Sequence, residues 1–394
     1  MRQNQLGKLI VGKYRMIFYL SMVILVVGYF FILKKNQLDL QNKTSVEISD
    51  YIIGKMSACH ENDDTSKCYQ ANAEDFINRF ELNNIMTVFD QNEKTPEFFD
   101  KCHRTAHFLG QTAYKKYGSI AAVFSQTNGV CLGGVYHGAV EGYFMAQGTT
   151  DIKDTKVRQQ INSVCGTPKD YVEPQKFIEC NHGLGHAVMY LTKNDLPEAL
   201  DMCEALSSKN ERSLCYTGAL MANADSFGST DHPTKYIKED DPLYPCSILK
   251  KEQQEMCYTY GVLSRFQFDL AKSISVCSSV PGEFKNQCFG TLGRDRTIIS
   301  SDPLELKSQC YQIKKEEFRK DCISGTSYNL VIRFGANSDI PASYCSITDA
   351  MYKDNCYNRI FGALGNITKD QAVVKKFCEK ISDESYKNKC LNSI

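Results

Sequence analysis

The sequence predicts an all-α protein, with an N-terminal transmembrane helix followed by an α-solenoid-like ectodomain of helical hairpins stapled by disulfides. Residues 16–33 contain no charged side chain and are just long enough to cross a bilayer core as a helix. All 18 cysteines lie beyond this segment, and an even number is typical of an oxidising compartment. Beyond residue 195, a sequence motif of two predicted helices with one cysteine in each recurs to the end of the chain. Such a repeat is typical of stacked helical hairpins, each of which buries its apolar face against its neighbours.

The N-terminal segments define the predicted topology. Four basic residues precede the apolar segment and only two follow it closely, so the positive-inside rule makes residues 1–15 a cytoplasmic tail. No small-x-small site follows Leu33, which favours an uncleaved signal-anchor at 16–33 over the alternative of a cleaved signal peptide. Residues 34–55 are polar and are predicted to form a stalk. We therefore expect a single-pass membrane protein with its N-terminus in the cytoplasm and the bulk of the chain outside it.

Composition excludes some partners and reactions. The 46 basic residues are balanced by 46 acidic ones, and no basic stripe marks a phosphate-binding face, so nucleic acid is not an expected partner. The chain contains neither a GxSxG nucleophile elbow nor a GxxxxGK[ST] phosphate loop. The motifs of serine hydrolases and of P-loop nucleotide-binding proteins are thus missing.

The cysteine spacing predicts the disulfides of residues 201–394, the Cys-pair repeat region. In each unit, ten or eleven residues separate a cysteine near the end of one helix from a cysteine in the next helix, which suits a bridge across one hairpin. We expect this region to be scaffold, with a surface for a protein partner. The predicted pairs are Cys203–Cys215, Cys246–Cys257, Cys277–Cys288, Cys310–Cys322, Cys345–Cys356, Cys378–Cys390, the earlier pairs Cys59–Cys68 and Cys165–Cys180 and, by elimination, Cys102–Cys131.

Residues 56–200 form a predicted histidine-bearing helical region. One long helix is delimited by Thr95 as N-cap with proline after it, and by Gly118 at its C-terminal end. Further helices are expected from residue 130 to about 146 and from about residue 174. The helix from residue 130 carries a stripe of glycines, each of which costs roughly 1 kcal/mol relative to alanine. The stripe therefore predicts close packing of another helix against Gly134, Gly138 and Gly142, with a GxxxG membrane dimer as the alternative.

Three i, i+4 pairs in this region carry the predicted chemistry. Residues four apart on a helix lie on one face with Cβ atoms roughly 5–6 Å apart, so two side chains of such a pair can hold one metal ion. Buried structural hydrogen bonding is the alternative role of these histidines. The predicted ligands are His103 and His107, His137 and Glu141, and His182 and His186.

The ligand types favour particular metals. Imidazole suits zinc, copper and iron, while a carboxylate among histidines favours iron or manganese over copper. HxxxH and HxxxE on separate helices, as in 103–107 and 137–141, resemble the ligand pattern of hemerythrin-like di-iron bundles, in which a carboxylate bridges two irons. The resemblance covers only ligand types and spacing, because the Asp-bearing helix motif of that family is missing and disulfide repeats are present. It implies iron as the metal, with zinc or copper as alternatives.

Two classes of function follow. The first is a membrane-anchored, extracytoplasmic non-haem metal or di-metal oxidoreductase with Glu141 at the reacting centre. A zinc hydrolase using Glu141 as general base is a variant of this reading, although the chain contains no HExxH motif. Haem is disfavoured because no CxxCH motif occurs, and a site using the thiolates of Cys102 and Cys180 is disfavoured by the oxidising compartment. The second class is a helical-repeat scaffold that binds a protein without catalysis.

Overall fold

The computed structural model describes residues 45–59, 65–93, 95–148, 155–226, 233–266 and 269–392. Within these ranges the regular structure is entirely helical, so the all-α prediction is confirmed. The predicted transmembrane segment, 16–33, lies outside the described residues. Within the described residues, no helix is both long and apolar enough to cross a membrane.

The helix at the start of the described residues belongs to the globular fold. Its apolar residues Ile48, Ile52 and Met56 recur every four positions, so they share one face, and all three are buried against later helices. The segment 45–55, predicted as part of a stalk, is therefore mostly packed helix. In chain order, the described residues begin with α2 (Ser45–Ser57), α3 (Thr65–Arg79) and α4 (Leu82–Asn92).

The helices that carry the predicted ligands begin and end largely as their signals predict. Helix α5 has Thr95 as N-cap and ends at Gly118, which adopts a left-handed conformation (φ 70°). Helix α7 begins later than expected, because Cys131 and Leu132 have positive φ values and form a short 3₁₀ turn, η1 (Cys131–Gly133), before it. The elements of this part are α5 (Pro96–Tyr117), α6 (Ile120–Phe124), α7 (Gly134–Gln147), α8 (Thr155–Ser163), η2 (Pro168–Asp170) and α9 (Pro174–Leu191).

Glycines let these helices approach almost to backbone contact. A Cβ atom placed on Gly138 would lie 1.9 Å from the carbonyl oxygen of His107, and one on Gly183 would lie 2.9 Å from Cα of His137. A Cβ on Gly218 would lie 1.9 Å from the carbonyl oxygen of His182. The close packing predicted from the glycine stripe is confirmed, and it sets the spacing of the helices that carry the ligands.

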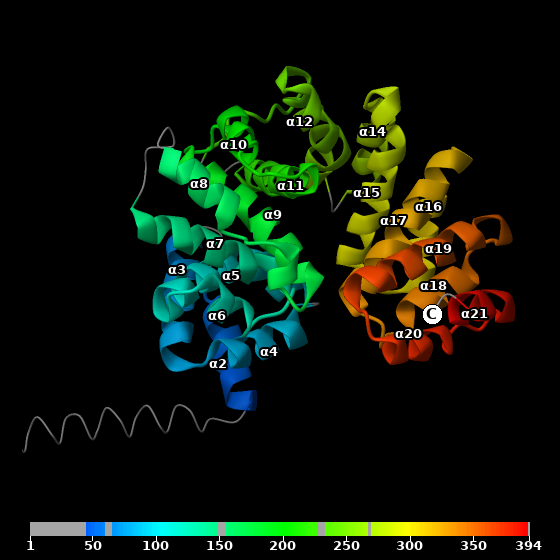
Figure 1. Ribbon diagram of the computed structural model, residues 1–394, viewed down its shortest axis with the longest axis horizontal. Coiled ribbons are helices and arrows are strands. Elements are labelled where there is room, and N and C mark those ends of the chain that lie inside the picture. Colours follow the sequence, from blue (N-terminus) through cyan, green and yellow to red (C-terminus); the bar gives the residue numbers. More distant parts are fainter. Residues whose placement is uncertain are drawn as a thin grey trace, which may run out of the picture.

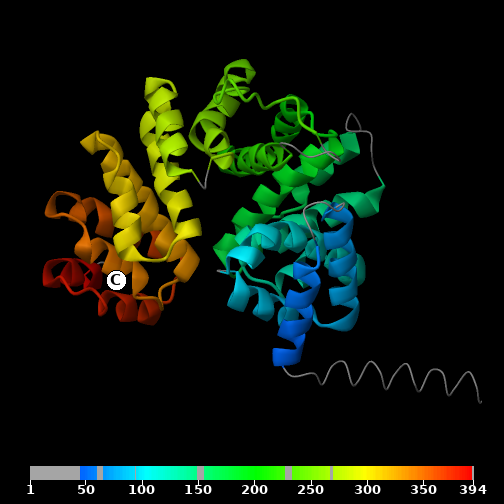
Figure 2. The ribbon, with the colours of Figure 1, turned by 180° about the vertical axis from the view of Figure 1, so that it is seen from behind.

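Beyond α9 the chain continues as stacked helical hairpins, which both views show as a curved array (Figures 1 and 2). One helix of each hairpin packs on its counterpart in the next, from α9 to α11, through the π-helical turn η4, and on to α15, α17 and α19. The helices are α10 (Leu196–Cys203), α11 (Lys209–Asp225), η3 (Cys246–Ile248), α12 (Lys251–Met256), η4 (Cys257–Gly261), α13 (Val262–Ser264), α14 (Leu270–Ser279), η5 (Gly282–Phe284), α15 (Lys285–Ile299), α16 (Pro303–Tyr311), α17 (Glu316–Phe334), α18 (Ile340–Ile347), α19 (Ala350–Ile367), α20 (Gln371–Cys378) and α21 (Glu384–Leu391).

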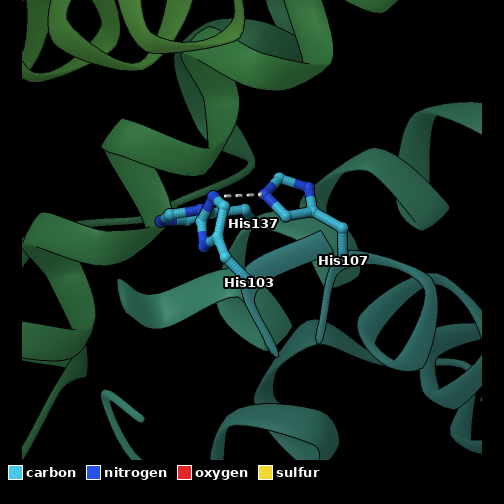
Figure 3. Close-up of side chains that lie close together, drawn as sticks. All are labelled: His103, His107 and His137. Carbon is cyan, nitrogen blue, oxygen red and sulfur yellow. Dashed lines mark hydrogen bonds between the residues drawn. The ribbon is translucent and has the colours of Figure 1, made fainter. Parts of the chain in front are cut away.

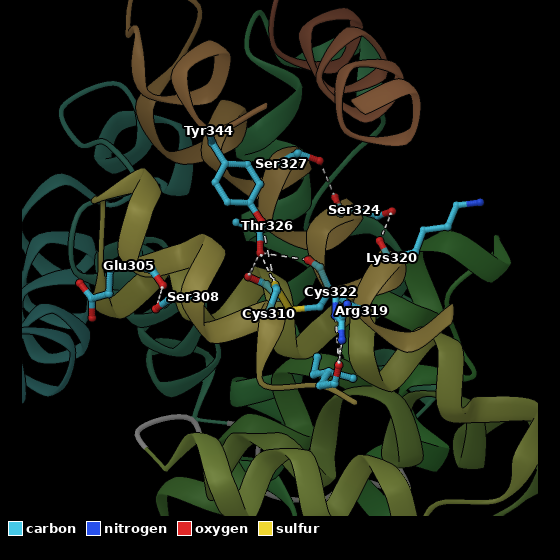
Figure 4. Close-up of a disulfide and its surroundings, with 12 residues drawn as sticks. Glu305, Ser308, Cys310, Arg319, Lys320, Cys322, Ser324, Thr326, Ser327 and Tyr344 are labelled. Carbon is cyan, nitrogen blue, oxygen red and sulfur yellow. Dashed lines mark hydrogen bonds between the residues drawn. A yellow bond between two sulfur atoms is a disulfide. The ribbon is translucent and has the colours of Figure 1, made fainter. Parts of the chain in front are cut away.

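All nine predicted disulfides are present. The bridge Cys310–Cys322 illustrates the local staple, since it joins α16 to α17 within one hairpin (Figure 4). The hydroxyl of Thr326 lies 3.5 Å from the sulfur of Cys310 and donates to the carbonyl oxygen of Gly293, 3.0 Å away on α15. The disulfide within this hairpin and the hydrogen bond to the preceding hairpin therefore meet at one buried threonine.

The array curves until its C-terminal part meets its N-terminal part. Helix α19 contacts α9. Near the end of α17, the guanidinium of Arg333 lies 3.6 Å from the carboxylate of Glu93, which follows α4. Beside this contact lies an open cavity of about 1070 Å³, lined mostly by residues of α3, α5, α7, α9 and α11, with Arg333 of α17 in its wall.

Candidate metal centre

The structure brings the six predicted ligands together, two from each of the adjacent helices α5, α7 and α9. Figure 3 shows His103 and His107 directed toward His137 on the neighbouring helix. Three overlapping groups have ligand atoms that lie within 4.8 Å of one another. These groups are His103–His107–His137, His137–His182–His186 and His107–Glu141–His186.

The two histidines of α5 face each other through their Nε2 atoms, which are 3.2 Å apart. Nδ1 of His103 donates to the carbonyl oxygen of Cys131 (2.8 Å), and Nδ1 of His107 donates to Oε1 of Glu141 (3.0 Å). Because both Nδ1 protons are engaged, the facing Nε2 atoms of two neutral rings present lone pairs to each other. A shared proton or a metal ion has to lie between them. Two imidazoles bound to one ion at about 2.0–2.1 Å in tetrahedral geometry have nitrogens about 3.3 Å apart, close to the observed distance.

Glu141 is held in its ionised form. Burial alone would raise its pKa, but the nearby His107 and the amide of Gln111, which donates to Oε2 at 2.7 Å, lower the pKa overall. For His107 burial opposes the charged form, yet attraction to Glu141 raises its pKa overall. Of the two facing rings, His107 therefore binds a proton more readily than His103 does, and a bound metal cation would replace that proton.

His137 is fixed from behind by a residue that was not predicted as part of the site. Its Nε2 atom lies 3.2 Å from Oε2 of Glu179, and Gln175 donates to the other oxygen of Glu179 at 2.6 Å. Burial raises the pKa of Glu179 to about 7. When Glu179 is ionised it accepts the Nε2 proton, which leaves a lone pair on Nδ1 of His137. That buried Nδ1 has no hydrogen-bond partner among the described residues.

The histidines of α9 present lone pairs for similar reasons. The hydroxyl of Thr217 donates to the carbonyl oxygen of Leu214 (2.7 Å), so at 2.9 Å it accepts the Nδ1 proton of His182 and leaves Nε2 unprotonated. In His186 the Nε2 atom is buried and, within the part of the chain that the structure describes, has no hydrogen-bond partner. Its ring stacks on that of His137 with centroids 4.7 Å apart.

Burial keeps four of the five rings neutral. Loss of solvent, followed by repulsion from other histidines, lowers the pKa of His103 and of His182 to about 3. The same causes lower the pKa of His137 and His186 well below the ordinary value. Neutral imidazole is the form that binds metal. Because burial disfavours protonation of these rings, protons compete less with a metal ion for their nitrogens.

The arrangement fits two ions better than one. His107, His137 and His186 each belong to two of the three groups, whereas His103 and His182 do not share a group with each other. A single ion would leave several of the six side chains without a role. Two ions would divide the ligands and place the shared side chains between them.

The site opens on the central cavity. Of the six predicted ligands, His103, His107, Glu141 and His186 line the cavity, and the other two lie behind them. A molecule in the cavity would therefore approach the proposed metal site from one side. On the opposite side, contacts behind the ligands, such as that of His137 with Glu179, close the site.

Sequence reasoning missed three supporting residues. Gln111 had a signal, because it follows His107 by four positions on the same face of α5. Thr217 had a weaker one, since it stands two residues after its repeat cysteine, as His182 does. Glu179 had none, because its role depends on the packing of α9 on α7.

Comparison with known proteins supplies no relative: no family model, curated protein or solved structure matches the chain.

Proposed function

We propose that the chain is a metalloprotein whose three ligand pairs hold a histidine-rich centre of two metal ions, and that it works as a non-haem oxidoreductase on a molecule bound in the adjoining cavity. The observation that carries the proposal is the convergence of buried ring nitrogens that need a proton or a metal ion as partner. The Nε2 atoms of His103 and His107 face each other at 3.2 Å, and Nδ1 of His137 and Nε2 of His186 are buried with no partner among the described residues. Buried polar atoms without partners are costly, and bound metal ions would supply partners for these two nitrogens and replace the proton between His103 and His107.

The donor set favours iron, with zinc or copper as alternatives. Five imidazoles and one carboxylate are ligands of intermediate softness, which suit a redox-active divalent metal better than magnesium or calcium. Glu141 already binds His107 and Gln111 through its two oxygens. Each carboxylate oxygen keeps a second lone pair with which Glu141 can bind a metal. The two hydrogen bonds count against the zinc-hydrolase reading, in which Glu141 would have to be free to accept a proton from water.

Membrane anchoring and an extracytoplasmic location belong to the same proposal. Eighteen cysteines forming nine bridges, with no free cysteine among the described residues, support an oxidising compartment. The anchor itself rests on the apolar segment 16–33. A fusion of alkaline phosphatase after residue 60 should be active in a bacterial host, and an inactive fusion there would contradict the orientation.

Metal analysis of the purified full-length chain tests the centre. We expect about two ions per chain, and we expect the double variant His137→Ala, His186→Ala to lose most of them, because these residues occur in all three ligand groups between them. Met221→Leu is the matched control. It changes the position that follows its repeat cysteine by six residues, as His137 and His186 do, but it replaces no ligand.

The contrary outcome is equally clear. If the double variant keeps its full complement of metal, the histidines are structural. The helical-repeat scaffold that binds a protein partner would then be the better reading.

A further inference from the structure

Along the helices that carry the ligands, the cavity wall changes from metal-binding side chains to apolar ones. On α7, Phe144 and Met145 follow Glu141 by about one turn, and on α9, Met189 and Tyr190 follow His186 by the same interval. Three to four residues of helix correspond to about 5–6 Å. Both helices therefore pass from ligands to apolar residues within one turn. The apolar belt, as we call this layer, consists of Phe108, Phe144, Met145, Met189, Tyr190 and Met221.

Part of the apolar belt is open to solvent. Tyr190 is 48% exposed and Met145 is 38% exposed, so two of the large exposed apolar side chains of the described residues line the same cavity. Three of the six belt residues are methionines, whose flexible, polarisable side chains adapt to ligands of different shape. Exposed apolar surface beside a concave site is typical of a place where a ligand completes the packing.

The polar end of the cavity would be positively charged once metal is bound. Two divalent ions carry four positive charges, and Glu141 is the only carboxylate among the predicted ligands. Arg104, one residue beyond His103, also lines the cavity. The other acidic groups of the wall are Glu93, which lies 3.6 Å from Arg333, and Asp225, whose carboxylate interacts with Arg104 and His107.

We propose that the cavity binds an amphipathic organic anion, with its acidic oxygens toward the metal ions and its apolar body against the apolar belt. This inference rests on the metal centre proposed above and names the substrate class of that same site. The volume of about 1070 Å³ lies just above the range of about 300–1,000 Å³ for small-molecule sites, so the cavity has room for a drug-like or lipid-like acid and is far larger than dioxygen requires.

Isothermal titration calorimetry on the metal-loaded full chain in lipid nanodiscs tests the inference, with empty nanodiscs as the blank. The probes are 2-naphthoate and the cation 2-naphthylmethylammonium, which share an apolar body and differ in charge. We expect naphthoate to bind at least tenfold more tightly than the cation. Removing the metal should weaken naphthoate binding by at least tenfold, because the acidic group would lose its partner.

Tyr190→Asp tests the apolar belt, because it places a carboxylate at an exposed position that tolerates a polar side chain. It should weaken naphthoate binding at least tenfold while the metal content stays the same. Met351→Asp is the matched control, since Met351 is 60% exposed on α19 and does not line the cavity. Its affinity should stay within twofold of the parent.

Two results would overturn this inference while leaving the metal centre in place. In the first, metal-loaded protein binds both probes equally or binds neither. In the second, Tyr190→Asp binds naphthoate as well as Met351→Asp does. Protein that takes up no metal would instead refute the proposed function, and this inference with it. The metal content of every sample therefore separates the two failures.

Discussion

Gly138→Ala tests whether backbone contact between α5 and α7 sets the geometry of the site. The new Cβ atom would lie 1.9 Å from the carbonyl oxygen of His107, whereas ordinary contact begins at 3.4 Å, so the helices must separate by about 1.5 Å. Overpacking costs about 1–3 kcal/mol, and a contact with backbone places the cost near 3 kcal/mol. The better helix propensity of alanine returns about 1 kcal/mol. We expect a net loss of about 2 kcal/mol in the free energy of unfolding.

Metal content is the second readout of Gly138→Ala. Ligand distances have to be correct to about 0.2 Å, so a shift of 1.5 Å between the helix of His107 and the helix of Glu141 should remove most of the metal. Urea unfolding and elemental analysis measure the two effects. Gly362→Ala on α19 is the control, because a Cβ there meets nothing within 4 Å, and it should stabilise by up to about 1 kcal/mol. If Gly138→Ala keeps its metal and its stability as Gly362→Ala does, the close approach does not position the ligands.

Three further predictions concern separate parts of the molecule. Glu141→Gln should lower the metal content or abolish an absorption band of the oxidised centre, since an amide is a weaker ligand than a carboxylate; unchanged metal and spectra would deny Glu141 a place in the centre. Replacing both Cys310 and Cys322 by serine should cost about 2–3 kcal/mol in urea unfolding. In that variant, non-reducing peptide mapping should show the other bridges unchanged, and new pairings elsewhere would contradict the local hairpin staples. Arg333→Ala should cost about 1–2 kcal/mol, below the value for a fully buried pair because its partner Glu93 is partly exposed, and no loss would mean that this contact does not hold the two halves together.

The elements that the sequence predicts well are those fixed by local chemistry. Helix α5 begins after Thr95 and ends at Gly118 as its capping residues indicate. The bridges follow from a spacing that repeats six times, because two cysteines eleven or twelve positions apart in a helical hairpin come to lie side by side. The ligand pairs follow from the helical period alone.

Other features depend on contacts between distant segments, which leave no local pattern. The start of α7 is delayed by the left-handed conformations of Cys131 and Leu132, residues that ordinarily avoid positive φ. The closure of the array depends on Arg333 meeting Glu93 across 240 positions of sequence. Residues 45–55 read as polar overall, yet the few apolar side chains among them share one face and are buried.

The position two residues after the repeat cysteine shows how one scaffold is adapted around the centre. In the first unit it is Gly133, where a Cβ would lie 2.5 Å from Oε2 of Glu179, so the absence of a side chain makes room for the partner of His137. In the second unit it is His182, a predicted ligand, and in the third it is Thr217, which accepts the Nδ1 proton of His182. Equivalent positions in successive hairpins thus supply space, a ligand and a hydrogen-bond acceptor. Because each role depends on the neighbouring unit, a Thr217→Val variant, which keeps the shape and removes the acceptor, should weaken metal binding although Thr217 is not itself a ligand. Retention of parental affinity, measured by competition with a chelator, would show that the tautomer of His182 is not set by its neighbour.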